Sequence, residues 1–217
     1  NTEFRTYLAI VLTAILLIAL NLIIEMDMDT FTAVRFAVFQ VPSLSTTGFV
    51  SADFEVWPTF SKLLLLLLMV IGGCAGSTAS GIKVARIVLL VRNARAVILQ
   101  KLNPNRVIDI SLGGAHVDNA MLLRTGTFFF LYLAIIFVTS FLLTMDGLLP
   151  FDAIAVAITT LGNIGPAFGI VSATSTYAPL SDFAKGILCL TMLLGRLEIF
   201  TLLILLRPSF WRKTKRW

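Results

Sequence analysis

Long runs of apolar residues alternate along the chain with shorter polar segments that contain glycine or proline. A helix needs roughly 20 mostly apolar residues to cross the hydrocarbon core of a bilayer. Four segments meet or approach this length: Tyr7–Ile24, Phe60–Ile71 together with its unusual continuation, Leu122–Met145 and Phe183–Leu206. The pattern therefore predicts an all-α integral membrane protein with four spanning segments.

The connections after the first and third spans each contain a short apolar stretch. Thr30–Val41 predicts a helix of about twelve residues, roughly 18 Å long and half a membrane deep, which Pro42 is expected to end. The second stretch begins at Pro150 or Asp152 and continues to about Thr160. The loops STTGF and LGNIGP follow these helices. Each half therefore reads as span, re-entrant helix, polar loop and span, a repetition common in membrane transport proteins.

Both glycine loops have the composition of a cation site. Re-entrant backbone is tolerated at membrane depth only where it is buried in protein or lines water. A half-membrane helix directs the negative end of its dipole at such a loop, and extended backbone presents carbonyl oxygens to a partly dehydrated cation. The hydroxyls of Ser45, Thr46, Thr47 and Thr160 are candidate ligands. STTGF alone is equally typical of a surface turn, but two such loops in matching places favour the cation site.

The second span breaks into the segment GGCAGSTASG, residues 72–81. Glycine lets backbone leave helical geometry at little cost, and serine and threonine hydroxyls can satisfy the freed backbone groups. An alternative reading remains open at this stage, because small residues such as Gly72 and Gly76 also allow helices to pack closely. A phosphate-binding loop is excluded, because that pattern needs Lys and then Ser or Thr directly after the last glycine, whereas Ile82 stands there.

Charge is scarce and unevenly distributed. Charged residues make up 13% of the chain and hydrophobic residues 58%, whereas soluble domains carry about 25% charged residues. Basic residues gather in 83–124 and after residue 206, and most acidic residues lie in the connections 25–59 and 146–182. Because basic loops stay on the cytoplasmic side, both termini are expected inside the cell. The net charge of +5 could suggest a protein that binds nucleic acid, but this distribution argues against it.

Two charged residues interrupt the fourth span. Arg196 lies at mid-membrane depth, where a charge is costly and usually faces a cavity or a partner. Glu198 follows two residues later and would lie on a different side of a continuous helix. An Arg–Glu pair within that helix is therefore not expected.

Five motifs together resemble one family. STTGF, GGCAGSTASGIKVAR, LGNIGPAFG, MLLGRLEIFTLL and RPSFWRK are similar to the TrkH branch of the Trk/Ktr/HKT superfamily of potassium transporters, from the first span to the last residue. The resemblance implies four membrane–pore-loop–membrane repeats around a pseudo-fourfold, potassium-channel-like pore. This chain would hold the third and fourth, in residues 1–110 and 111–217. We expect a fragment; the alternative is that two copies meet to close a pore.

The resemblance also implies the site residues. The two filter strands are Ser45, Thr46, Thr47 and Gly48, and Gly162, Asn163, Ile164 and Gly165; Gly48 and Gly165 match glycines that favour potassium. The gate consists of an intramembrane loop and Arg196. The gate residues of the loop are Gly72, Gly73, Gly76, Ser77, Thr78, Ser80 and Gly81. Arg196 either repels cations beside the gate or caps carbonyl groups of the loop, and both roles stay open.

The function expected from these features is potassium uptake through a carbonyl-lined filter in a bacterial inner membrane. The alternative is a coupled secondary transporter that uses Na⁺ or H⁺, although Glu198 is the only acid inside a full span. The spans hold no catalytic set, so no enzyme is expected, and potassium is cargo rather than a cofactor. By resemblance, the partners are a second copy of the chain and a cytoplasmic nucleotide-binding subunit with RCK-type domains.

Overall fold

The computed structural model describes residues 2–77, 79–103, 110–113, 115–197 and 199–205. Helices dominate this part of the chain, which confirms the all-α prediction apart from one hairpin of two-residue strands. The elements in chain order are α1 (Thr2–Met26), α2 (Thr30–Thr46), the 3-10 helix η1 (Phe54–Val56), α3 (Thr59–Val70), α4 (Val84–Leu102), β1 (Ser111–Leu112), β2 (Ala115–His116), α5 (Asn119–Met145), α6 (Pro150–Leu161), η2 (Gly169–Val171), α7 (Asp182–Arg196) and α8 (Ile199–Leu205).

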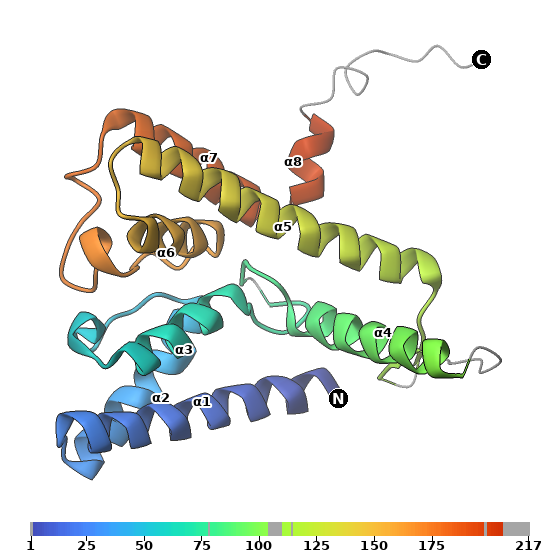
Figure 1. The fold of residues 1–217 in the computed structure, drawn as a ribbon, viewed down its shortest axis with the longest axis horizontal. Coiled ribbons are helices and arrows are strands. Elements are labelled where there is room, and N and C mark those ends of the chain that lie inside the picture. The colour runs from blue at the N-terminus through green and yellow to red at the C-terminus, as the bar shows by residue number, and fades with distance from the viewer. Residues whose placement is uncertain (1, 78, 104–109, 114, 198, 206–217) are drawn as a thin grey trace.

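The two halves of the chain have the same order of elements. In each half a long helix, α1 or α5, packs on a short helix, α2 or α6, and a polar loop leads to the next helix, α3 or α7 (Figure 1). Helices α3 and α6 contact each other across the two halves. The loops that follow α2 and α6 are thereby brought to the middle of the molecule.

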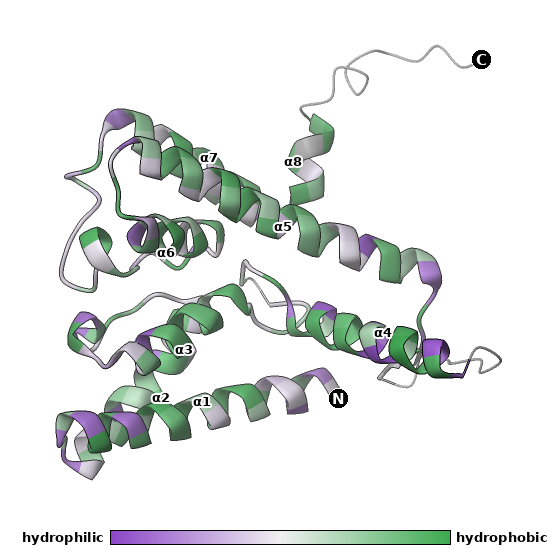
Figure 2. Ribbon diagram, viewed as in Figure 1, coloured by the Kyte–Doolittle hydropathy of each residue, from purple (hydrophilic) through white to green (hydrophobic). Residues whose placement is uncertain are grey.

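Helices α1 and α5 are long and apolar enough to cross a membrane. Their 25 and 27 residues correspond to about 38–40 Å of helix. Leu12, Leu16 and Leu20 repeat every fourth residue on α1 and are about half exposed, at 55%, 60% and 46%. On α5, Phe130 and Phe137 lie seven residues apart and are 70% and 73% exposed. Figure 2 shows hydrophobic residues in green along both helices. These exposed apolar faces fit lipid rather than water as their surroundings.

Helix α2 is longer than predicted, because Pro42 lies inside it and the helix continues to Thr46. Proline removes one hydrogen bond and usually ends or bends a helix. Here the turn after Pro42 is packed into the core, where Ser43, Leu44 and Ser45 are buried, and this packing outweighs the local preference. The N-terminus is capped by Asp29, whose Oδ2 accepts hydrogen bonds from the amides of residues 31 and 32 at 3.1 and 3.3 Å.

The second apolar run is divided as predicted. Helix α3 ends at Val70 and α4 begins at Val84, so the described residues between Gly72 and Gly81 are not helical. Packing of a continuous small-residue helix is therefore the wrong interpretation. Helix α4 continues away from this break and packs along α5 (Figure 1).

The fourth apolar run is not one helix, which corrects the prediction of a single span from Phe183. Helix α7 ends at Arg196, and Leu197 adopts φ −86° and ψ 10° before α8 begins. A Cβ atom at Gly195 would overlap the carbonyl oxygen of Leu161, so this glycine lets the end of α7 lie directly against the end of α6. Glu198 falls outside the described residues. The prediction that it lies on a different side of the helix from Arg196 therefore stays a prediction.

Candidate cation pathway and intramembrane loop

The loop after α2 begins as a helix end rather than an extended strand. Ser45 and Thr46 form the last residues of α2, which corrects the expectation of a strand from Ser45 to Gly48. The amides of Thr47 and Gly48 both donate to the Ser43 carbonyl oxygen, at 2.7 and 2.8 Å. Gly48 has φ +81°, a conformation that glycine adopts without steric cost. The chain therefore leaves the helix abruptly at the predicted filter glycine.

Two polar side chains of α2 hold the outgoing chain after Gly48. The Ser43 hydroxyl donates to the Phe49 carbonyl oxygen at 2.6 Å. The Gln40 amide donates to the same oxygen at 3.5 Å and accepts from the Ser51 amide at 3.3 Å. Gln40 is fully buried. The sequence analysis missed this support, although two polar residues three positions apart in an apolar re-entrant helix were a usable signal.

Thr159 performs the same task for the loop after α6. Its hydroxyl donates to the Pro166 carbonyl oxygen at 2.7 Å and accepts from the Gly165 amide at 3.2 Å. The Thr159 carbonyl oxygen accepts from the Ile164 amide at 2.9 Å. By contrast, the buried Thr160 hydroxyl donates back into its own helix, so the structure does not place this predicted ligand on a cavity. The sequence analysis did not identify this support by Thr159; the role of Thr160 as an ion ligand stays a prediction.

Tyr177, from the loop before α7, supports the same loop from the outer side. Its hydroxyl donates a short hydrogen bond to the Gly165 carbonyl oxygen. Burial raises the pKa of Tyr177 to about 12, so the hydroxyl keeps its proton, and with it the ability to donate, at physiological pH. Gly165 itself has φ +114°, and a Cβ atom there would meet no atom within 4 Å.

The two loops touch directly. A Cβ atom on Gly48 would overlap the carbonyl oxygen of Ile164 and would lie 3.1 Å from Cδ of Pro166. Only a residue without a side chain allows this approach. The tertiary structure thus brings together the two loops that the sequence analysis assigned to a filter.

The segment between α3 and α4 is a closed loop. Its two ends form a parallel bridge between Ile71 and Ile82. The Gly72 amide donates to the Ile82 carbonyl oxygen at 3.0 Å, and the Ile82 amide donates to the Val70 carbonyl oxygen at 3.1 Å. A Cβ atom on Gly72 would overlap the Ser80 carbonyl oxygen. Residues 71–82, which we call the intramembrane loop, therefore project from a narrow neck; Thr78 lies outside the described residues.

Three other segments hold the intramembrane loop. The Ser45 hydroxyl donates to the Ile71 carbonyl oxygen at 3.2 Å, and Nδ2 of Asn163 lies 3.2 Å from the Ser80 hydroxyl. Oε1 of Glu3, on α1, accepts hydrogen bonds from the Ala75 amide at 2.5 Å and from the Ala85 amide, at the start of α4, at 3.3 Å. Glu3 was missed in the sequence, because nothing local links it to a loop some 70 residues away.

Two cavities adjoin the intramembrane loop and share Arg196. One, of about 430 Å³, extends from Thr46 and Thr47 at the end of α2 to the loop and Arg196. The other, of about 250 Å³, also adjoins the loop and reaches Lys83, Arg86 and the α5 residues Phe128 and Tyr132. Both cavities therefore adjoin the intramembrane loop and Arg196, and the larger one also reaches the end of α2.

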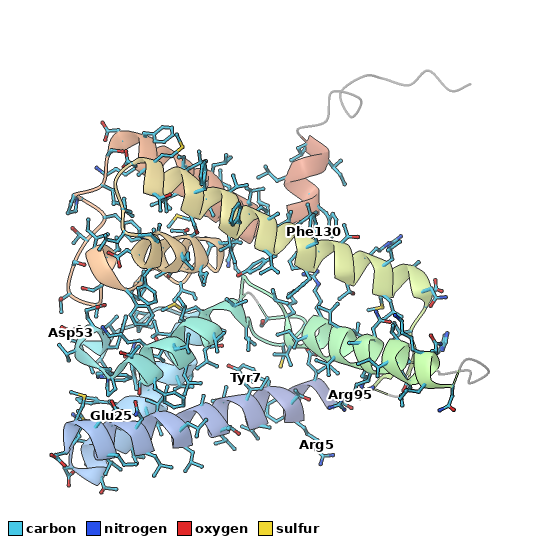
Figure 3. The ribbon with its side chains drawn as sticks, in the orientation of Figure 1. Arg5, Tyr7, Glu25, Asp53, Arg95 and Phe130 are labelled. Atoms are coloured by element: carbon cyan, nitrogen blue, oxygen red, sulfur yellow. The ribbon has the colours of Figure 1, made fainter. Side chains whose placement is uncertain are left out.

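The charged residues labelled in Figure 3 separate by sign along the molecule. Glu25 and Asp53 lie at the end that carries the loops after α1 and α2, and Arg5 and Arg95 lie at the other end (Figure 3). At the acidic end Glu55 joins the two halves, because it pairs with Lys62 at 2.9 Å and accepts from the Gly169 amide at 3.0 Å. The side of the membrane on which each end lies stays a prediction from the loop charges.

Comparison with known proteins agrees with this arrangement. The TrkH family model, described as a cation transport protein, matches residues 5–213. The Trk system potassium uptake protein TrkH of Salmonella typhimurium is 38% identical over 215 residues, which cover 98% of this chain and 44% of the relative. The protein TrkG of Escherichia coli K12 is 34% identical over 172 residues, or 78% of this chain and 34% of the relative.

A solved structure matches as well. The crystal structure of the potassium transporter TrkH from Vibrio parahaemolyticus superimposes with a TM-score of 0.89 at 36% identity, over 98% of this chain and 45% of that one. The chain thus spans less than half the length of the curated relatives it matches most fully. The family resemblance of the motifs is confirmed: the chain belongs to the TrkH family of cation transport proteins.

Proposed function

We propose that this chain contributes two of four pore-loop repeats, in residues 1–110 and 111–217, to a potassium uptake pathway in the bacterial inner membrane. Relatives named as Trk system potassium uptake proteins support the choice of ion. The observation that carries the proposal is the meeting of Gly48 with Ile164 above a cavity that the intramembrane loop and Arg196 adjoin. A narrow point lined by backbone suits a partly dehydrated cation.

The filter would consist of Ser45–Gly48 and Gly162–Gly165. The C-terminal ends of α2 and α6 both point into these segments, and a helix C-terminus carries partial negative charge. Gln40, Ser43 and Thr159 hold the backbone, so that carbonyl groups keep their orientation when an ion replaces water. Such rigid support is what selection among ions of similar size requires.

The intramembrane loop and Arg196 would form the gate. The loop has a narrow neck, and its glycines at positions 76 and 81 have φ +88°, which few other residues adopt readily. Arg196 lines both cavities that adjoin the loop. A positive charge there repels cations until the loop and the arginine move.

The basic end of the molecule would face the cytoplasm, with both termini inside. Its cationic residues offer a surface for a nucleotide-binding regulatory subunit of the RCK type, and two copies of the complete transporter would associate in the membrane. The separation of charge between the two ends supports this orientation.

The decisive experiment is rubidium influx with sodium as competitor, in cells that lack their own potassium uptake. The complete reading frame that encodes this chain is compared with the same frame carrying Gly48→Ser. Influx that sodium barely inhibits, and that becomes sodium-sensitive in the variant, supports the proposal. Influx that depends stoichiometrically on sodium or protons would favour coupled transport instead. No influx at any tested potential would contradict a potassium pathway.

A further inference from the structure

One side chain links the loop after α6 to two other parts of the molecule. Nδ2 of Asn163 lies 3.2 Å from the Ser80 hydroxyl oxygen and 3.2 Å from the Met192 carbonyl oxygen. A carboxamide nitrogen has two hydrogens to donate, so both bonds form at once. Asn163 also has φ +52°, an uncommon backbone conformation for a residue other than glycine. The side-chain amide therefore points toward the intramembrane loop and α7.

The same residue is directly joined to the point where the two glycine loops meet. Ile164 follows Asn163, and its carbonyl oxygen is the atom that lies against Gly48. The side-chain nitrogen Nδ2 of Asn163 lies close to Gly195: a Cβ atom on Gly195 would be 2.9 Å from it. The side chain is thus fitted between α7 and the intramembrane loop, one residue before the Ile164 carbonyl group that meets Gly48.

We propose that Asn163 is a positioning residue that couples the intramembrane loop to the filter. With the loop in place, Ser80 and Met192 fix the Asn163 amide and, through the backbone, the Ile164 carbonyl oxygen. When the loop moves aside, the bond to Ser80 is lost and the Asn163–Ile164 segment loses one of its two anchors. The state of the gate is thereby transmitted to the narrowest point of the pathway. This inference rests on the proposed filter and gate.

The geometry offers variants that separate the two bonds. Ser80→Ala removes the bond to the intramembrane loop and leaves the bond to Met192. Asn163→Leu has a similar volume and removes both. The matched control is Thr139→Val, which removes a buried hydrogen bond between two elements, the 3.2 Å contact with Thr191 that joins α5 to α7, and touches neither the loop nor the filter.

The first measurement is the rate at which a thiol reagent modifies Cys74, in the complete reading frame with its other cysteines replaced. Cys74 belongs to the intramembrane loop and lines the larger cavity, so its rate reports loop movement. Loss of one hydrogen bond is expected to raise the rate roughly fivefold in Ser80→Ala. Asn163→Leu should raise it at least as much, and the double variant no more than Asn163→Leu alone, because the two residues share one bond.

The second measurement is sodium competition against rubidium influx. Ser80 lies outside the filter, yet Ser80→Ala is expected to make influx more sensitive to sodium. A gate without coupling would change the influx and leave ion preference as it was. Thr139→Val should change neither measurement.

Several outcomes would overturn the inference. One is an unchanged rate of Cys74 modification in Asn163→Leu. Another is a double variant in which the effects of the two substitutions on that rate add. The third is a changed modification rate in Ser80→Ala without a change in ion preference. Absence of rubidium influx from the unsubstituted protein would count against the proposed function instead. The modification rates would still decide whether a substitution in the filter segment releases the intramembrane loop.

Discussion

Gly48 and Ile164 lie so close together that the structure leaves no room for a side chain between the Cα of one and the carbonyl oxygen of the other. These residues come from opposite halves of the chain, and each follows the end of a short helix. The contact is therefore the point at which the two repeats determine each other's geometry.

Gly48→Ala is expected to disturb this contact in two ways. The new Cβ atom overlaps the Ile164 carbonyl oxygen, and the backbone at φ +81° becomes strained, at a cost of about 1–2 kcal/mol for the backbone alone. We expect weaker discrimination against sodium, measured as sodium inhibition of rubidium influx. Gly186→Ala on α7 is the control, because a Cβ atom there meets nothing within 4 Å. Equal ion preference in both variants would argue against a filter at Gly48.

Arg196→Ala is expected to raise rubidium influx. The guanidinium group adjoins both cavities, and removing one positive charge beside a cation path lowers the barrier by about 1.4 kcal/mol, or roughly tenfold in rate. Arg35→Ala serves as control, since Arg35 lies on α2 and lines neither cavity. A fall in influx, with normal amounts of protein in the membrane, would favour a purely structural role for Arg196.

Glu3→Gln is expected to loosen the intramembrane loop. The carboxylate accepts from the Ala75 and Ala85 amides, and the latter belongs to the positive N-terminal end of α4, where an anion is favourable. A neutral amide keeps an acceptor oxygen but loses the charge, which weakens the interaction by about 1 kcal/mol. Faster thiol modification of Cys74 would show the effect. An unchanged rate would mean that the neck at Ile71 and Ile82 suffices to hold the loop.

The adjacent threonines of α6 should respond differently to the same change. Thr159→Val leaves the Gly165 amide and the Pro166 carbonyl oxygen without this partner in a partly buried place, at a cost of about 1–3 kcal/mol. Thr160→Val removes only hydrogen bonds to carbonyl groups of its own helix and should cost less. Thermal unfolding of the purified protein in detergent gives the comparison. Equal shifts in Tm would contradict the proposed support of the loop by Thr159.

Tyr177→Phe removes the hydrogen bond to the Gly165 carbonyl oxygen and is expected to reduce selectivity. Because burial raises the pKa of Tyr177 to about 12, the protonated, donating form is retained as pH rises and is lost only near that value. Ion preference of the unsubstituted protein should therefore be constant between about pH 6 and 9 as far as Tyr177 is concerned. A change in preference that Tyr177→Phe abolishes would show that the hydroxyl titrates in this range.

Much of this protein follows from the sequence by itself. The apolar runs, the half-membrane helix that begins at Pro150, the break after Val70 and the separation of acidic from basic segments all agree with the structure. Each depends on composition or on residues within a few positions of one another. Hydrophobic length, helix propensity and charge act locally, so they can be read along the chain.

Only the tertiary structure decided the remainder. Helix α2 continues past Pro42 because the following turn is buried. Helix α7 ends at Arg196, where Gly195 lies against Leu161. The tertiary structure also directed Asn163 to Ser80, and Glu3 to the intramembrane loop. Hydrogen bonds and close approaches between distant segments depend on where the backbone places each atom, to within a fraction of an ångström. That placement results from the packing of all the helices together, and no local pattern contains it.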